Sequence, residues 1–500
     1  MSAQSLPFEE TTMREKPGTA SMLVRQRRFP YPYKALLAIS ADVDSTSPWK
    51  FIRIHRFLNT LTPAIPHYGE GVGLDVSNSF FFKNVSNNAL SVYDAGYRYS
   101  SEDVWAHEFR SKIARVKDSA NARDPVTGRL VFEAGPHFIE KYIRCGWIDV
   151  LHGGDGNWGE HVFKLGAADW SRADGHHYME WLARRGLKID TFTNHSEVTS
   201  DFGVPSQAST EAKPRSMGDL SSSPAYWADY ARQSGIKFFW SYIPSESAAW
   251  RRTFGQDSML VPATFRDSGK FWHFSRYSSG KPYADTVESI LNPNNLDSLV
   301  KDGKFEIAYT HFGYWSHVAN RGRRLAYLRR LVRFLRSMGQ AIFSAANVAW
   351  LSPVRPLGAH PELGATSISS FRLLKAYQDE KKILVARTSR LLRYNLALDH
   401  LAFTASHLNE VVIINITAIK DTQFGDFTPT VNDVRGLTFF VSNSSKAEIR
   451  ICDAKLPETE IQRNPADETG QPSIGIKWFQ PDYTDYTTWT LSEVNRRFSH

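Results

Sequence analysis

The sequence predicts an α/β protein, a distorted (β/α) barrel of seven or eight strands followed by an all-β, sandwich-like domain. Three observations support this prediction. A helix that ends at a glycine and leads into a short apolar strand recurs five times between residues 138 and 343. The first predicted strand, at residues 35–40, is apolar or small throughout, as in strands covered on both faces. Beyond residue 390 the pattern changes to β-branched runs separated by turn residues.

Composition and charge fit a soluble globular chain. Hydrophobic residues make up 42% of the sequence and charged residues 22%, and the net charge is +8. Seven arginines in the segment 321–336 surround an apolar helical seam. A basic helix can bind nucleic acid or anionic lipid, but inside a repeating β/α pattern a solvated outer face is the better interpretation. We therefore expect no nucleic-acid partner.

The cysteines and the start of the chain predict a cytoplasmic protein. The two cysteines, Cys145 and Cys452, lie far apart in the sequence, each in an apolar setting. This pattern indicates neither a disulfide framework nor a zinc cluster. The first 28 residues are polar and charged and lack the apolar core of a signal peptide. Because no run of about 20 apolar residues occurs, we expect no membrane span.

The predicted barrel occupies residues 30–350, after a segment at 1–29 that we expect to be disordered because it has no hydrophobic periodicity. The first strand is followed by a helix over 49–61, a strand over 76–82 and a helix over 101–117. Five helix–glycine–strand units then follow, and glycine suits a helix end because it adopts positive φ at little cost. The helices and strands of these units are predicted at 138–145 and 147–151, 171–185 and 187–192, 224–234 and 236–240, 296–302 and 305–309, and 325–338 and 340–343.

Two helix starts also carry recognisable signals. Ser171 and Asp174 have the spacing of a capping box, and Pro224 is predicted at a first helical position. Residues 204–223 are rich in Ser, Thr and Pro and predict a loop over the site, whereas 241–295 predict an elaborated connection. An open doubly wound sheet is the alternative to the barrel.

The rest of the chain is predicted to carry no catalytic residues. Residues 351–390 are interpreted as a helical linker, and residues 391–500 as an all-β accessory domain. The barrel region has no Gly-x-Gly-x-x-Gly after its first strand and no P-loop, so binding of a dinucleotide or nucleoside triphosphate is disfavoured.

Polar residues at the ends of predicted strands form the candidate site. Asp42 and Asp44 follow the first strand, although this stretch is also good helix-capping composition. His152, His195 and His311 end three later strands. Because the carboxyl ends of parallel strands share one face, these five side chains should converge.

Five such groups suit metal-assisted hydrolysis of an ester or amide. Imidazoles and a carboxylate are common ligands of divalent metals such as zinc. A second carboxylate can take a proton from the metal-bound water, and a further histidine can protonate the leaving group.

This arrangement resembles the polysaccharide deacetylase superfamily, whose distorted β/α barrel places two acids after its first strand and histidines after later ones. It also resembles a branch of that superfamily associated with bacterial surface glycans, through its Asp-x-Leu-His stretch at 149–152 and its Asn-His stretch at 194–195. Two positions depart from the pattern. Val43 separates acids that are usually adjacent, and Thr199 stands where the family has its second histidine.

The resemblance implies a metal-dependent hydrolase that removes an N- or O-acetyl group from a carbohydrate. It implies Asp42 as the base, Asp44 and His195 as metal ligands and His311 as the acid. His152 is expected to supply the ligand that Thr199 cannot. We expect zinc as the metal, with manganese or cobalt as alternatives.

Further residues are expected around this centre. Asp149 or Asn194 is expected to orient a ligand imidazole. Aromatic residues near strand ends are expected either to line a sugar cleft or to pack in the core, namely Trp158, Trp240, Phe312, Tyr314 and Trp315. Two alternatives stay open. One is a glycoside hydrolase that uses Asp42 with Asp155 or Glu197, and the other is a non-catalytic glycan-binding protein with a degenerate site.

Overall fold

The computed structural model describes residues 24–499, with gaps at 45, 47, 85–89, 95–134, 154–170, 195–201, 203–217, 241–258, 268, 277–282, 314 and 317–362. The chain divides into two compact units. We call the larger one the α/β unit, which comprises residues 33–396, 422–425 and 480–500. The smaller one, the β unit, comprises residues 1–32, 397–421 and 426–479.

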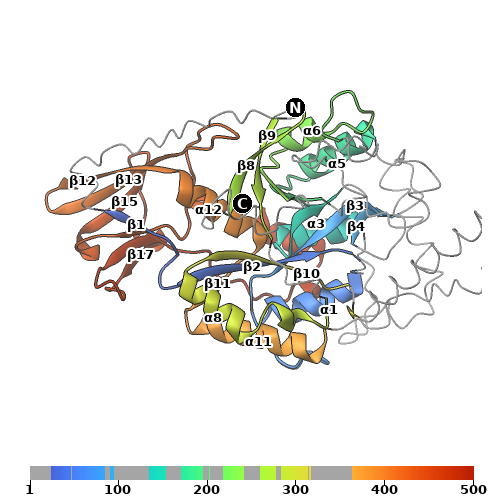
Figure 1. The fold of residues 1–500 in the computed structure, drawn as a ribbon, viewed down its shortest axis with the longest axis horizontal. Helices are drawn as coiled ribbons and strands as arrows, with labels where there is room; N and C mark the ends of the chain where they lie inside the picture. Colours follow the sequence, from blue (N-terminus) through green and yellow to red (C-terminus); the bar gives the residue numbers. More distant parts are fainter. Residues whose placement is uncertain are drawn as a thin grey trace, which may run out of the picture. The chain divides into compact units, whose positions relative to one another are not determined.

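A curled, half-barrel sheet of ten strands forms the frame of the α/β unit (Figure 1). Its strand order is β10-β2-β3-β5-β6-β7-β9-β8, with β4 beside β3 and β11 beside β2. The pairings are parallel except for the β8–β9 hairpin. The predicted α/β class with a parallel sheet is therefore confirmed, whereas a closed barrel is not seen in the described residues. The strands are β2 (Ala35–Asp42), β3 (Ser77–Asn84), β4 (Ser91–Asp94), β5 (Ile148–His152), β6 (Thr191–Thr193), β7 (Phe238–Trp240), β8 (Leu260–Phe265), β9 (Gly269–Phe274), β10 (Phe305–His311) and β11 (Ile383–Val385).

The helices of this unit largely follow the predicted pattern. Gly146, Gly186, Gly235 and Gly303 follow helix ends at positive φ, as expected. The capping box of Ser171 is formed, with the Ser171 hydroxyl accepting from the backbone N–H of Asp174. The predicted elements at 101–117, 325–338 and 340–343 lie outside the described residues. The helices are α1 (Pro48–Asn59), α3 (Pro136–Arg144), α5 (Arg172–Arg184), α6 (Ala228–Gln233), α8 (Pro293–Asp302), α11 (Ala365–Asp379), α12 (Thr388–His400) and α13 (Leu491–Phe498).

One predicted helix start is wrong. Helix α6 begins at Ala228, four residues after Pro224, so Pro224 does not occupy its first position. The chain before the helix instead forms turns, in which the Tyr226 N–H donates to the carbonyl of Ser223.

Strand β2 has one apolar face and one face that becomes polar towards its carboxyl end. Side chains alternate between the faces of a strand. Leu37, Ile39 and Ala41 pack in a core shared with α1, α8 and α11, and Figure 1 shows α8 and α11 alongside β2 and β10. Ser40 and Asp42 take the alternate positions and are also buried. The curled sheet therefore encloses polar groups on the face opposite these helices.

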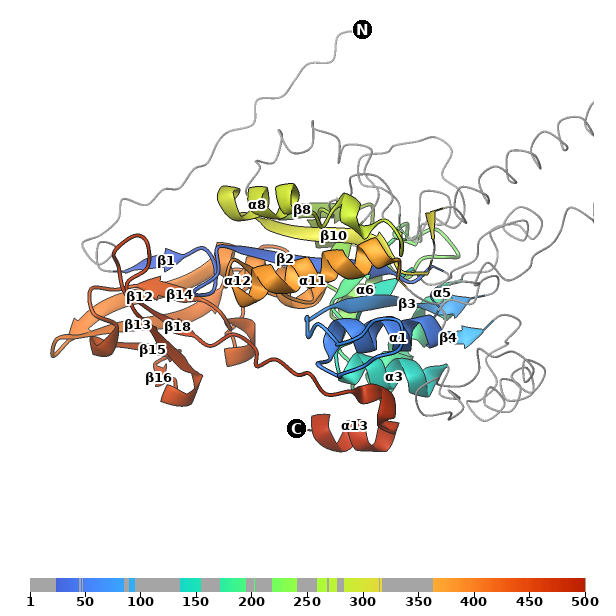
Figure 2. The ribbon, with the colours of Figure 1, turned by 90° about the horizontal axis from the view of Figure 1, so that it is seen from below.

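The α/β unit takes in more of the C-terminal half than predicted. Strand β11 pairs in parallel with β2, so the segment 351–390 contributes to the sheet and is not simply a linker. At the end of the chain, Tyr486 and Val494 are fully buried in the core of this unit. Figure 2 shows α13 beside α3. The predicted range 391–500 therefore does not form one separate domain, because residues 480–500 belong to the α/β unit and supply apolar surface to its core.

The start of α12 is bound to the sheet through charged groups. Arg387 and Arg390 both pair with Asp75, which lies two residues before the start of β3. Burial alone would raise the pKa of Asp75, but the two guanidinium groups lower it to about 2. Arg393 pairs with Asp190 just before β6. These contacts hold the first turns of α12 against the amino ends of the strands.

The β unit consists of two four-stranded sheets, ordered β1-β14-β18-β17 and β12-β13-β15-β16. The rings of Phe403 and Phe439, one from each sheet, lie 5.1 Å apart. Strand β1 at residues 25–27 pairs with β14, so the predicted disorder of residues 1–29 is wrong at this strand. The strands are β1 (Arg25–Arg27), β12 (Leu401–Leu408), β13 (Val411–Ile419), β14 (Thr438–Phe440), β15 (Ala447–Ile451), β16 (Ala454–Lys455), β17 (Ile461–Asn464) and β18 (Ser473–Ile476).

Candidate active site

Adjacent strands bring the first acid and the last histidine together. β10 runs parallel to β2, and His311 stands opposite Asp42 in the register of the pair. Because both residues end their strands, their side chains meet at the carboxyl edge of the sheet. This is the edge at which parallel α/β folds carry their functional groups.

Asp42, Asp44 and His152 form a buried cluster at this edge. Each offers a ligand atom, and the three atoms lie within 4.8 Å of one another. His152 Nε2 is 3.4 Å from Asp44 Oδ2, and His152 Nδ1 is 3.6 Å from Asp42 Oδ1. The imidazole therefore lies between the two carboxylates.

His311 joins the same cluster from β10. Its Nε2 atom is 3.5 Å from Asp44 Oδ2 and 2.9 Å from the hydroxyl of Tyr309. The side chain of His311 is 12% exposed, compared with 1% for His152. His311 thus has better access to solvent than the deeper histidine.

A buried arginine holds Asp42. Arg276 Nη1 donates to Asp42 Oδ1 at 2.7 Å, and its Nη2 donates to Oδ2 at 3.4 Å. The guanidinium also lies 3.6 Å from the ring centre of Trp240 and 4.3 Å from that of Tyr309. Burial alone would raise the pKa of Asp42, but Arg276, and then His152 and His311, hold it below its ordinary value. Asp42 is therefore a carboxylate at neutral pH.

Tyr309 stays protonated beside this carboxylate. Burial raises its pKa well above the ordinary value, and the negative charge of Asp42 adds to the effect. Sequence reasoning did not identify Tyr309 or Arg276. Arg276 lies just after β9, in a region interpreted only as a connection. The signal that could have found it is a charged residue shortly after a strand, because Arg276 lies two residues beyond the end of β9.

The groups predicted to orient the ligands have other partners. Asp149 Oδ2 accepts a hydrogen bond from the backbone N–H of Ser389 at 2.8 Å and so binds the start of α12, and the role of Asp149 in orienting an imidazole stays a prediction. Asn194 binds the backbone of Phe202 through both its amide oxygen and its amide nitrogen, and its orienting role stays a prediction. Thr193, which was not predicted, lies 2.7 Å from His152 Nδ1.

The predicted aromatic residues have different surroundings. Phe312 is 2% exposed and packs against His55 and Phe371, so it belongs to the core and not to a sugar-binding surface. Trp315 is partly buried against the same core. Trp240 is partly exposed and carries Arg276 against its ring. Of the predicted aromatic residues that the structure describes, only Trp240 and Trp315 are therefore partly exposed and accessible to a ligand.

Several predicted residues lie outside the described part of the chain. They include one of the three expected metal ligands and two of the expected aromatic residues, so their placement stays a prediction. These residues are Trp158, His195 and Tyr314, together with Asp155, Glu197 and Thr199.

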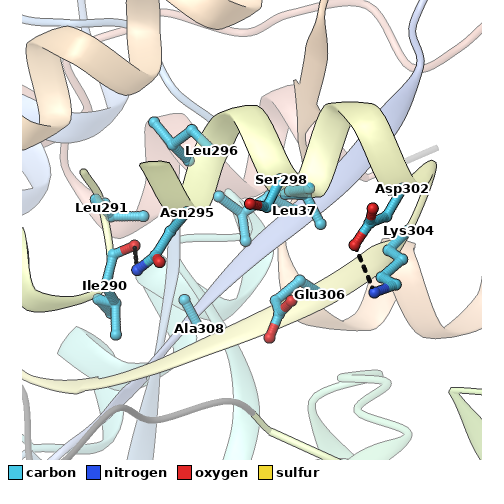
Figure 3. Close-up of a pocket in the computed structure, with 11 residues that line it drawn as sticks. Leu37, Ile290, Leu291, Asn295, Leu296, Ser298, Asp302, Lys304, Glu306 and Ala308 are labelled. Carbon is cyan, nitrogen blue, oxygen red and sulfur yellow. Dashed lines mark hydrogen bonds and ion pairs between the residues drawn. The ribbon is translucent and has the colours of Figure 1, made fainter. Parts of the chain in front are cut away.

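A separate cavity of about 170 Å³ lies on the opposite face of the sheet, between α8 and the strands β2 and β10. Figure 3 shows Leu37 and Ala308 of the strands beside Leu296 and Ser298 of α8. Leu37 and Ala308 belong to the apolar core that β2 shares with α1, α8 and α11, so this cavity is not part of the Asp42 cluster.

Comparisons with known proteins do not place the chain in a family. No protein-family model matches it, and no curated protein or solved structure gives a significant match. Among the described residues, none of the helices combines the length and apolar character needed to cross a membrane.

Proposed function

We propose that the α/β unit is a metal-dependent hydrolase that removes an acyl group, such as acetyl, from a carbohydrate. The observation that carries this proposal is the buried group of Asp42, Asp44 and His152, whose ligand atoms lie within 4.8 Å of one another. The nearby imidazole of His311 adds a further proton-transfer group at the same strand edge.

The donor set suits a divalent cation. Two carboxylates and an imidazole offer oxygen and nitrogen atoms, which zinc, manganese and cobalt accept. Asp44 and His152 are the ligands we assign here, and His195 stays the predicted third. When bound, such a metal lowers the pKa of a water molecule and polarises a carbonyl group.

The roles of the other groups follow from their surroundings. Asp42 is ionised and is oriented by Arg276, so it can accept a proton from an attacking water. His311 is the more exposed of the two histidines, which suits a group that protonates a leaving group on the substrate. The same pair of roles is implied by the resemblance to polysaccharide deacetylases.

The carbohydrate substrate rests on sequence motifs. They are Asp42-Val43-Asp44, Asp149-Val150-Leu151-His152 and Asn194-His195. The partly exposed ring of Trp240, next to the buried Asp42–Arg276 pair, is consistent with a sugar-binding surface at this edge.

Metal analysis and product analysis of the purified full chain test the proposal. We expect one divalent metal per chain after reconstitution with zinc, manganese or cobalt, and release of acetate from acetylated oligosaccharides. Asp44→Asn should lose both properties. Asp302→Asn is the matched control, because Asp302 is exposed and forms a surface ion pair with the neighbouring Lys304.

Three outcomes contradict the proposal in different ways. Wild-type protein that binds no metal after reconstitution would favour a glycan-binding protein. New reducing ends without acetate would indicate a glycoside hydrolase. Acetate release that survives Asp44→Asn would place the chemistry elsewhere in the chain.

A further inference from the structure

A threonine on β6 faces the buried histidine of the site. β5 and β6 are parallel neighbours, and Thr193 stands opposite His152 in their register. Residues paired in this way project from the same face of the sheet. Thr193 is fully buried, so its hydroxyl must find its partners within the protein.

The hydroxyl of Thr193 bridges an imidazole and a carbonyl group. Its oxygen lies 2.7 Å from His152 Nδ1, and the hydroxyl donates to the backbone carbonyl of Leu151 at 3.3 Å. A carbonyl oxygen can only accept a hydrogen bond. If the hydroxyl hydrogen is directed to Leu151, its oxygen is left to accept the hydrogen of Nδ1–H.

The remaining contacts of the imidazole agree with a hydrogen bond in which Nδ1–H of His152 donates to the hydroxyl oxygen of Thr193. Asp42 Oδ1, a carboxylate oxygen, lies 3.6 Å from the same Nδ1 atom. Nδ1 thus faces two oxygens that can accept its hydrogen. Nε2 points the other way and lies 3.4 Å from Asp44 Oδ2. A neutral imidazole carries its hydrogen on one nitrogen only, and a metal binds the other.

We propose that Thr193 is a positioning residue that holds His152 in the tautomer protonated on Nδ1 and so presents Nε2 to a divalent metal beside Asp44. This inference rests on the proposed function and adds a residue to it. Groups that orient a ligand imidazole in this way commonly change metal affinity by about 10–100-fold when they are removed.

Replacement of the hydroxyl by a methyl group tests the proposal. Thr193→Val keeps the shape of the side chain and removes the acceptor, so the Kd for zinc, measured by competition with a chelator, should rise about 10–100-fold. Thr193→Ser restores the hydroxyl and should recover most of the affinity. Thr191→Val is the matched control, because Thr191 is buried on the same strand and its hydroxyl donates to Asp190.

The sign of the change in zinc affinity on Thr193→Val distinguishes the two possible directions of the hydrogen bond between Thr193 and His152. If the hydroxyl donated to Nδ1, the free imidazole would carry its hydrogen on Nε2, and Thr193→Val would leave zinc affinity unchanged or increase it. Either result overturns the proposal. A loss of affinity that Thr193→Ser does not recover also overturns it, because the methyl-bearing shape and not the hydroxyl would then matter.

A second readout does not depend on metal. Nitrogen NMR of histidine-labelled, metal-free protein, with the His152 signals assigned through His152→Gln, should give the pattern of the Nδ1-protonated tautomer. Thr193→Val should shift these signals towards a tautomer mixture. A wild-type signal of the Nε2-protonated form would overturn the proposal. Wild-type protein that binds none of zinc, manganese and cobalt would instead overturn the proposed function, while the NMR result would still decide whether Thr193 fixes His152.

Discussion

Asp42 and Arg276 form a buried ion pair across 234 residues of sequence, with Oδ1 and Nη1 2.7 Å apart and side chains 4% and 2% exposed. Burial of either charge alone would be costly, because a charge loses its hydration when it leaves water. The pair therefore links the position of the proposed base to the end of β9.

Arg276→Met should destabilise the α/β unit strongly. Loss of one partner from a buried pair leaves an uncompensated charge and typically costs about 3–5 kcal/mol. The double variant Asp42→Asn with Arg276→Met should recover part of that loss, because neither member of the pair is then left as a buried charge without its partner. Urea denaturation, monitored by tryptophan fluorescence, measures the free energy of unfolding of the single and the double variant. Arg184→Met, which breaks an exposed pair with Glu180, is the control and should cost at most about 1 kcal/mol. A double variant no more stable than Arg276→Met would show that the pair is not the cause.

Asp42 and Asp44 should differ in their effect on metal binding. Asp42→Asn should keep the metal and lower the rate of acyl hydrolysis by about 10²–10⁴-fold, the usual contribution of a general base. Asp44→Asn, and His195→Ala at the predicted ligand, should lose metal and activity together. Metal content and rate are measured on the same preparations. Loss of metal from Asp42→Asn would make Asp42 a ligand and not the base.

The buried histidine of α1 should make stability depend on pH. His55 is fully buried, its Nδ1 bonds to Asn59 Oδ1 at 3.0 Å, and burial lowers its pKa from 6.5 to about 4. Between these two values the unfolded chain binds the proton and the folded chain does not, so stability falls as pH falls from about 6.5 to about 4. The full effect is on the order of 3 kcal/mol.

His55→Gln removes this titration while it keeps a polar side chain near Asn59. The slope of unfolding free energy against pH over that window should become shallower than in the wild type, as measured by denaturation at a series of pH values. His176→Gln, at an exposed position on α5, should leave the slope unchanged. Equal slopes for His55→Gln and the wild type would refute the assignment.

The C-terminal helix should be required for the stability of the α/β unit. Val494 of α13 is fully buried in its core, so Val494→Asp should cost more than about 3 kcal/mol by burying a charge. Arg496→Asp places the same charge at an exposed position two residues away and should have a small effect. Thermal unfolding of both variants compares them. Equal melting temperatures would contradict the burial of this helix.

The sequence by itself determined the local elements and the chemistry at strand ends. Gly146, Gly186 and Gly303 mark helix ends because positive φ is a property of one residue and its neighbours. Likewise, apolar runs that end in Asp42, His152 and His311 predict strands with polar carboxyl ends. In a parallel sheet such ends share one edge, so the meeting of these three groups could be predicted before their distances were known.

Only the tertiary structure decided which distant residues complete the site and the core. Arg276 has no local signature that pairs it with Asp42, and Thr193 becomes a partner of His152 only through the register of β5 and β6. Val494 belongs to the α/β unit although its neighbours in sequence follow the strands of the β unit. Burial and long-range pairing depend on how the whole chain packs, and a pattern read along a few residues does not contain that information.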